Sequence, residues 1–231
     1  MAYTIEDIHN RFLQLVDKEK NGYITPNEID RLIDIAQMEE LNELYGNPRK
    51  DGIPMHLGRS QSINDQLSPF IKSYALNSGN TASGLITMPN DYLFAVTLYY
   101  HEPKPGGFNK RFASAITEEE LSYRLTSQVI PPTQSDPVYV QRQGALRVFD
   151  GSSPAATFAG ELIYIKRPNK PVFVYGQVGR TITYDSGAST QMEWRDSSIN
   201  NIIYRAISIG GFTLADANTA QYGDAKQKEG S

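Results

Sequence analysis

The chain has 231 residues, of which 39% are hydrophobic and 21% are charged, and it contains no cysteine. This length and composition are typical of one folded globular domain, or of one domain with a smaller domain appended, and not of a disordered chain. The lack of cysteine excludes disulfides, thiolate metal sites and cysteine nucleophiles. The net charge of -4 argues against a surface that holds nucleic acid, because such a surface needs lysine and arginine to neutralise phosphates.

The first part of the chain predicts two helices. Apolar residues at helical spacing predict a helix over residues 5–16, with Thr4 and Asp7 as its capping box. The segment 25–28, TPNE, predicts the start of a second helix that runs to about Tyr45, antiparallel to the first. The first residues are acidic and amphipathic, and no apolar run is long enough to cross a bilayer, so we expect neither a targeting segment nor a membrane partner.

The middle of the chain predicts strands. From Leu85 onward, runs of β-branched and aromatic residues replace the helical spacing. We expect the segment 104–112, KPGGFNKRF, to be a flexible connection. It precedes a third helix at about 117–127, for which Thr117 and Glu120 form a capping box. A turn near Gly144 then predicts a β-hairpin.

These elements predict an α+β fold. An N-terminal helical hairpin and a C-terminal helix are expected to frame a small antiparallel β domain that is sandwich-like or barrel-like. We expect an N-terminal helical region (residues 1–76), followed by a β-rich region that contains the inserted helix (77–192). A C-terminal helix (193–212) is expected to pack on the N-terminal helices, and an extended tail (213–231) follows it. The tail is polar and rich in small residues, so we expect it to need a partner in order to fold.

The sharpest chemical motif lies between the first two helices and resembles the loop of an EF-hand. Oxygen-bearing residues alternate along it, with glycine at the sixth position and glutamate at the twelfth, as calcium loops require. The candidate ligands are Asp17, Glu19, Asn21, the carbonyl of Tyr23, Thr25 and Glu28. Glu19 is longer than the usual ligand, Pro26 is unusual inside such a loop, and no second loop exists to pair with it. A tight turn at Gly22 followed by a helix cap explains the same residues.

Other catalytic and cofactor patterns are missing from the sequence. His9, His56 and His101 have no partners at metal-ligand spacing. The sequence contains no GxSxG nucleophile elbow, no GxGxxG motif and no phosphate-binding loop. It therefore gives no support to a serine hydrolase, a dinucleotide-binding enzyme or a nucleoside-triphosphatase. We therefore expect no enzymatic activity, no catalytic residues and no cofactor.

Five segments of the chain, in this order, form a recognisable set: FLQLVDKEKNGYITPNEIDRLIDIAQMEELNELYG, MPNDYLFAV, VIPPTQSDPVYV, ELIYIKRPNKPVF and MEWRDSSINNIIYRAISIGG. Together they resemble a virion structural protein of tailed phages, most closely proteins of crAss-like and related phages of Bacteroidetes. The likeness extends from about residue 8 to residue 212. In broader outline the chain is similar to the head-to-tail adaptors of short-tailed phages, known as tail tubular or gatekeeper proteins.

The resemblance implies a homo-oligomeric, dodecameric ring in the neck of a virion, which connects the portal to the tail and lets DNA pass. The implied partners are the portal protein, the next neck or tail ring, and genomic DNA that crosses the lumen without specific binding. The C-terminal tail would reach onto the portal, with Phe212, Leu214 and Tyr222 as its interface anchors. Two alternatives remain: a calcium-binding protein that uses residues 17–28, and another minor capsid or tail structural protein.

Overall fold

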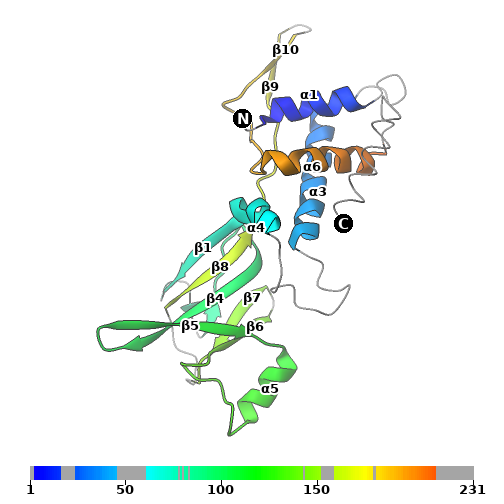
Figure 1. Ribbon diagram of the computed structural model, residues 1–231. Helices are drawn as coiled ribbons and strands as arrows, with labels where there is room; N and C mark the ends of the chain where they lie inside the picture. Colours follow the sequence, from blue (N-terminus) through cyan, green and yellow to red (C-terminus); the bar gives the residue numbers. More distant parts are fainter. Residues whose placement is uncertain are drawn as a thin grey trace. The chain divides into compact units, whose positions relative to one another are not determined.

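The chain divides into two compact units (Figure 1). The computed structural model describes residues 3–16, 24–45, 61–77, 79, 81–82, 84–142, 144–151, 159–178 and 181–211. The helical unit comprises residues 1–69 and 168–231, and the sheet unit comprises residues 70–167. The sheet unit is therefore an insertion in the sequence of the helical unit. The predicted α+β fold class is confirmed.

The helical unit combines helices from both ends of the chain with a short hairpin. Its elements are α1 (Ile5–Leu15), α3 (Pro26–Tyr45), α4 (Gln61–Leu67), β9 (Tyr175–Val178), β10 (Thr181–Tyr184) and α6 (Asp196–Ile209). A 3-10 turn, Ser68–Phe70, leads from α4 into the sheet unit. Thr4 and Asp7 form the predicted capping box at the start of α1, because each side chain accepts a hydrogen bond from the backbone of the other residue.

The core of the helical unit is formed by the apolar stripes of three helices. Helix α6 packs chiefly on α3 and also contacts α1, as predicted for the C-terminal helix. The fully buried side chains include Ile5, Ile8 and Phe12 of α1, Ile29, Ile33 and Leu41 of α3, and Ile202 and Ala206 of α6. In Figure 1, α3 crosses α1 and α6, whereas we expected α3 to run antiparallel to α1. The reason is that α6 covers the apolar stripes of both α1 and α3. These two helices therefore bury their apolar side chains mainly against α6 and need not pack along each other.

The sheet unit contains a curled, half-barrel sheet of eight strands in the order β1-β8-β4-β5-β6-β7-β3-β2. The strands are β1 (Ile71–Leu76), β2 (Thr81–Ala82), β3 (Leu85–Ile86), β4 (Tyr92–Lys104), β5 (Gly107–Ala115), β6 (Val138–Arg142), β7 (Ala145–Phe149) and β8 (Gly160–Lys166). Strands β6 and β7 form the hairpin predicted at Gly144, whose φ is 77°.

One pair of strands departs from the antiparallel sheet that we expected. Strands β5 and β6 run parallel and pair at Ser114–Val138 and Ala115–Tyr139. Helix α5 (Glu118–Thr126), with the predicted capping box of Thr117 and Glu120, lies between these strands in the chain. Parallel neighbours need a crossover connection, usually a helix, so α5 makes this pairing possible.

The core face of the sheet is lined by every second residue of its strands. Leu98 and Tyr100 of β4 pack with Leu162 and Tyr164 of β8 and with Leu146 of β7. The hydroxyl groups of the two tyrosines remain hydrogen-bonded, since Tyr100 donates to Asp150 at 3.0 Å and Tyr164 donates to Asp91 at 2.8 Å. Burial, together with the Asp91 hydrogen bond, raises the pKa of Tyr164 to about 12.

The boundaries of the two units differ from the predicted parts of the chain. Strand β1 belongs to the sheet unit, although residues 1–76 were expected to be helical. Residues 168–192, with the β9–β10 hairpin, belong to the helical unit and not to the β-rich region 77–192. The segment 104–112, expected to be a flexible connection, forms the end of β4, a turn at Gly106 and most of β5. Among the described helices, none has the length and apolar character needed to cross a membrane.

The close contact of Gly160 with the neighbouring strand predicts that a larger residue there destabilises the sheet unit. A Cβ at this position would lie 2.3 Å from the carbonyl oxygen of Tyr99 on the neighbouring strand β4. We expect Gly160→Ala to lower the free energy of unfolding by about 1–3 kcal/mol, as overpacking does in other cores. Gly176→Ala is the matched control, because nothing lies within 4 Å of the Cβ it would add. Urea unfolding checks this, and equal stability of the two variants would contradict it.

Candidate interaction surfaces

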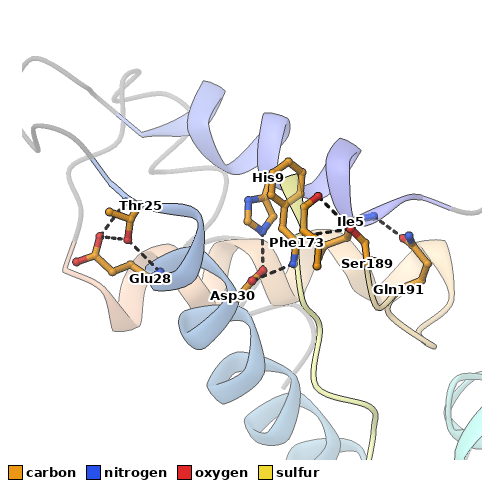
Figure 2. A network of polar contacts seen from close by, with 9 residues as sticks. Ile5, His9, Thr25, Glu28, Asp30, Phe173, Ser189 and Gln191 are labelled. Atoms are coloured by element: carbon orange, nitrogen blue, oxygen red, sulfur yellow. Dashed lines mark hydrogen bonds and ion pairs between the residues drawn. The ribbon is translucent and has the colours of Figure 1, made fainter. Parts of the chain in front are cut away.

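A buried polar network holds the returning C-terminal segment against the helices (Figure 2). His9 Nε2 lies 2.8 Å from Asp30 Oδ1, and the backbone N–H of Phe173 donates to Asp30 Oδ2 at 2.9 Å. The ring of Phe173 stacks on the imidazole of His9 at a centroid distance of 4.5 Å. His9 and Asp30 are each 4% exposed. The pair therefore joins α1, α3 and the segment before β9, in a place that a substrate cannot reach.

Further hydrogen bonds extend this attachment along residues 169–194. Buried Gln37 of α3 donates to the carbonyl of Asn169 at 3.1 Å and accepts from the indole N–H of Trp194 at 3.2 Å. The backbone N–H of Ile5 donates to the side chain of Gln191 at 2.7 Å. These contacts connect residues far apart in the chain. The network stabilises the fold of the helical unit.

The candidate calcium ligands are only partly within the described residues. Asp17, Glu19, Asn21 and Tyr23 lie outside them. Thr25 and Glu28 form a helix cap, in which both the backbone N–H and the hydroxyl of Thr25 donate to Glu28 Oε2 at 2.8 Å. The first of these bonds lowers the pKa of Glu28 most. Across the described part of the chain, no group of three or more acidic or histidine side chains could hold a metal ion.

The predicted interface anchors Phe212, Leu214 and Tyr222 also lie outside the described residues, as does His56. His101 is described. Its ring stacks on Phe108 at a centroid distance of 3.9 Å. Burial, with a smaller effect of Lys110, lowers the pKa of His101, so this histidine is a neutral aromatic partner near pH 7.

The β4–β5 hairpin carries an exposed aromatic surface, which we call the ribbon face: Tyr99, His101, Phe108, Lys110 and Phe112. These residues lie on the face of the hairpin opposite to the buried side chains of Tyr100 and Ala113, and the register places Tyr99 opposite Phe112 and His101 opposite Lys110. Phe112 is 60% exposed, and Phe108 is more than half exposed. The ammonium group of Lys110 lies 4.0 Å from the centroid of the Tyr99 ring. The ribbon face is therefore an apolar surface with a basic group in it.

A second apolar surface lies on α5 and the loop after it. We call it the α5 patch: Tyr123, Leu125, Val129 and Ile130. All four side chains are more than half exposed, and Val129 is 88% exposed. The loop is ordered by its own hydrogen bonds, because Ser127 Oγ accepts from the backbone N–H groups of Val129 and Ile130 at 3.2 and 3.1 Å. The side chains are thus presented to solvent by a defined turn.

A groove of about 590 Å³ adjoins the α5 patch, lined by residues that include Leu125, Pro131, Pro132 and Gly151. Gly151 has a φ of 81°, and a Cβ there would lie 2.5 Å from the carbonyl oxygen of Pro132. Because Gly151 has no side chain, the backbone of the loop at Pro132 can lie directly against the chain that follows β7. The ion pair between Arg124 and Asp136, at 2.9 Å, joins the helix to the far end of the loop.

Sequence reasoning did not single out either surface. A signal existed for each. Residues 108, 110 and 112 alternate Phe-x-Lys-x-Phe, which is typical of one face of a strand, and Val129-Ile130 is an apolar pair between a helix end and two prolines. The segment 104–112 was expected to be a flexible connection, and residues 129–130 entered only as the start of the segment VIPPTQSDPVYV. Exposed apolar side chains on ordered backbone are typical of interaction sites.

The Asp30 network predicts a stability effect. Asp30→Ala removes the acceptor for both His9 and the Phe173 N–H, and we expect it to destabilise the helical unit by about 3–5 kcal/mol, as breaking a buried pair does elsewhere. Glu39→Ala, an exposed acid on the same helix, is the control and is expected to change stability by less than about 0.5 kcal/mol. Thermal unfolding followed by circular dichroism compares the two, and a mild effect of Asp30→Ala would show that the network is dispensable.

The calcium alternative predicts a calorimetric signal. If residues 17–28 form a calcium site, titration gives micromolar binding that Glu28→Gln abolishes, because the bidentate ligand is lost. If Thr25 and Glu28 serve only as a helix cap, calcium gives no heat, which is the result that we expect. Asp7→Asn is the control, because it alters the capping box of α1 and leaves residues 17–28 unchanged.

Neither the scan against protein-family models nor the search of the curated proteins gives a match for this chain.

Proposed function

We propose that the chain is a structural component of a tailed-phage virion, which forms a ring in the neck, connects the portal to the tail and lets DNA pass. The ring consists of copies of this chain, and its other partners are the portal protein and the next neck or tail ring. No catalysis is required of any residue. The proposal follows the sequence resemblance given above, and the surface of the sheet unit supports it.

The observation that carries the proposal is that one folded unit presents two ordered apolar surfaces to solvent. The ribbon face and the α5 patch both lie on regular or hydrogen-bonded backbone, with Phe112 and Val129 among the most exposed apolar side chains. A protein that works alone rarely keeps such patches. A subunit with two different contact surfaces can join neighbours on both sides, as a ring requires.

Three of the five segments that carry the resemblance contribute to the framework of the helical unit, and the other two lie in the sheet unit. The motif ELIYIKRPNKPVF ends in the residues that bond to Gln37 and Asp30, through Asn169 and Phe173. The motif MEWRDSSINNIIYRAISIGG contains buried Trp194 and the helix α6. A likeness at these positions is a likeness in the framework of the fold, which supports a shared structural role.

Passage of DNA without binding is consistent with the charges of the chain. The net charge is -4, and several basic residues are paired with carboxylates, for example Lys72 with Asp91 and Arg205 with Glu40, each at 2.8 Å. Paired cations are less available to phosphates, and like charge repels the DNA backbone. Acidic residues are therefore expected to line the lumen, and a basic lumen in the assembled ring would overturn this step.

Electron microscopy of the purified full-length protein, alone and mixed with the portal protein of the same phage, tests the proposal. We expect closed rings, or rings that form only on the portal. Analytical ultracentrifugation at the same concentrations gives the mass of the assembly. A monodisperse monomer that ignores the portal would refute a neck ring. Binding to capsid shells or to tail tubes instead of the portal would favour the alternative of a minor capsid or tail component.

A further inference from the structure

We infer that each subunit docks the ribbon face of its β4–β5 hairpin onto the α5 patch of the next copy of the chain. This inference rests on the proposed self-assembly and assigns the two surfaces that meet in it. The occupant of the α5 patch is thus a second copy, and the contact joins two different surfaces of identical subunits.

The ribbon is shaped to reach a neighbour. Strands β4 and β5 remain paired as far as Lys104 and Gly107, whereas β5 meets β6 only at Ser114 and Ala115. Among the described strands, none pairs with the second edge of β5 from Gly107 to Ala113. The hairpin therefore projects beyond the sheet as a two-stranded ribbon (Figure 1), and Phe108 and Phe112 of β5 are exposed on it.

The α5 patch is shaped to receive aromatic side chains. Its groove of about 590 Å³ is open to solvent, so an aromatic ring can lie in it against Leu125 and Pro131. Val129 and Ile130 stand beside it on a turn whose backbone is already hydrogen-bonded to Ser127. Little ordering is needed on docking, and rigid aromatic anchors in a preformed pocket are typical of binding hot spots.

The chain segments that carry the two surfaces have opposite net charges; Lys110 lies on the ribbon face itself, and Glu102, Lys104 and Arg111 lie on the reverse face of the hairpin. From Tyr99 to Phe112 the chain has three basic residues, Lys104, Lys110 and Arg111, and one acidic residue, Glu102. From Thr117 to Asp136 it has four acidic residues, Glu118, Glu119, Glu120 and Asp136, and one basic residue, Arg124. Glu161 pairs with Lys110, and Arg142 pairs with Glu118, but the opposite net signs remain when both neighbours are counted. Opposite charge favours this pairing over ribbon with ribbon or patch with patch.

The geometry of the sheet unit makes the contact intermolecular. In Figure 1 the tip of the ribbon projects to one side of the sheet and α5 lies below its other side, so the tip of one copy does not cover its own patch. A contact between two different surfaces repeats from copy to copy in one direction. Such a contact closes into a ring when the rotation between neighbours permits, as the proposed function requires.

Cysteine cross-linking tests the contact, because the natural chain has no cysteine. The variants Phe112→Cys and Val129→Cys are prepared separately, mixed, and treated with a short bifunctional maleimide. We expect a covalent dimer only in the mixture, and a ladder of oligomers from the doubly substituted chain. Ile71→Cys replaces Val129→Cys as the control; Ile71 is 41% exposed on β1 and belongs to neither surface. Cross-linking of Phe112→Cys with itself would overturn the inference.

Serine variants give a second readout that does not depend on the cross-linker. Phe108→Ser with Phe112→Ser damages only the ribbon face, and Val129→Ser with Ile130→Ser damages only the α5 patch. Each pair is expected to weaken self-association by roughly thirtyfold or more, the effect of losing a hot spot. A mixture of the two damaged proteins retains one intact contact and should stop at a heterodimer in ultracentrifugation. Ile71→Ser is the matched control and should assemble like the natural chain.

The outcomes separate this inference from the proposed function. Rings that assemble normally from the serine variants, or that give no cross-link between positions 112 and 129, would refute the contact and leave the neck ring standing. A chain that forms no assembly, with or without the portal protein, would refute both.

Discussion

The carboxylate of Asp30 is the contact on which the helical unit depends. One oxygen faces His9 of α1, and the other accepts the backbone N–H of Phe173, so a single buried acid joins three parts of the chain. Without it, the segment that returns from the sheet unit would lose its main polar attachment to the N-terminal helices. Gln37 repeats the arrangement further along α3, with Asn169 and Trp194 as its partners. Buried polar groups of this kind specify one register because each leaves another unsatisfied if it moves.

The connections between strands explain why the two exposed surfaces lie on the sheet unit. Helix α5 is needed as the crossover between the parallel strands β5 and β6, and its one buried residue, Leu121, packs against Val138 and Val140. The outer side of α5 and the loop after it face solvent, so Tyr123 and Val129 are exposed. The β4–β5 ribbon is exposed because most of β5 precedes the two residues, Ser114 and Ala115, at which this strand pairs with β6. The two exposed surfaces thus arise at places where the chain changes direction between elements of the sheet unit.

Local signals predicted much of the fold. The capping boxes at Thr4 and Thr117 were found because a cap is determined by residues three positions apart, and the hairpin at Gly144 because its turn needs a positive φ. Strand β5 was missed because Phe108, Lys110 and Phe112 are exposed and the alternating residues Asn109 and Arg111 are polar, so the segment lacks the apolar buried face that marks a half-buried strand. The parallel pairing and the assignment of β9–β10 to the helical unit depend on contacts between distant residues, which no short window contains. The α5 patch consists of residues close together in the chain, but their exposure depends on how the fold around them covers one side of α5, so the sequence alone did not mark them as a surface.

The insertion of the sheet unit has a consequence for synthesis. Translation releases residues 70–167 complete before α6 has left the ribosome, whereas α1 and α3 must wait for α6 and the segment around Phe173. The sheet unit can therefore mature first, as domains fold in the order in which they emerge. The N-terminal helices spend that interval with their apolar stripes uncovered, which makes them the part of the nascent chain most in need of a chaperone.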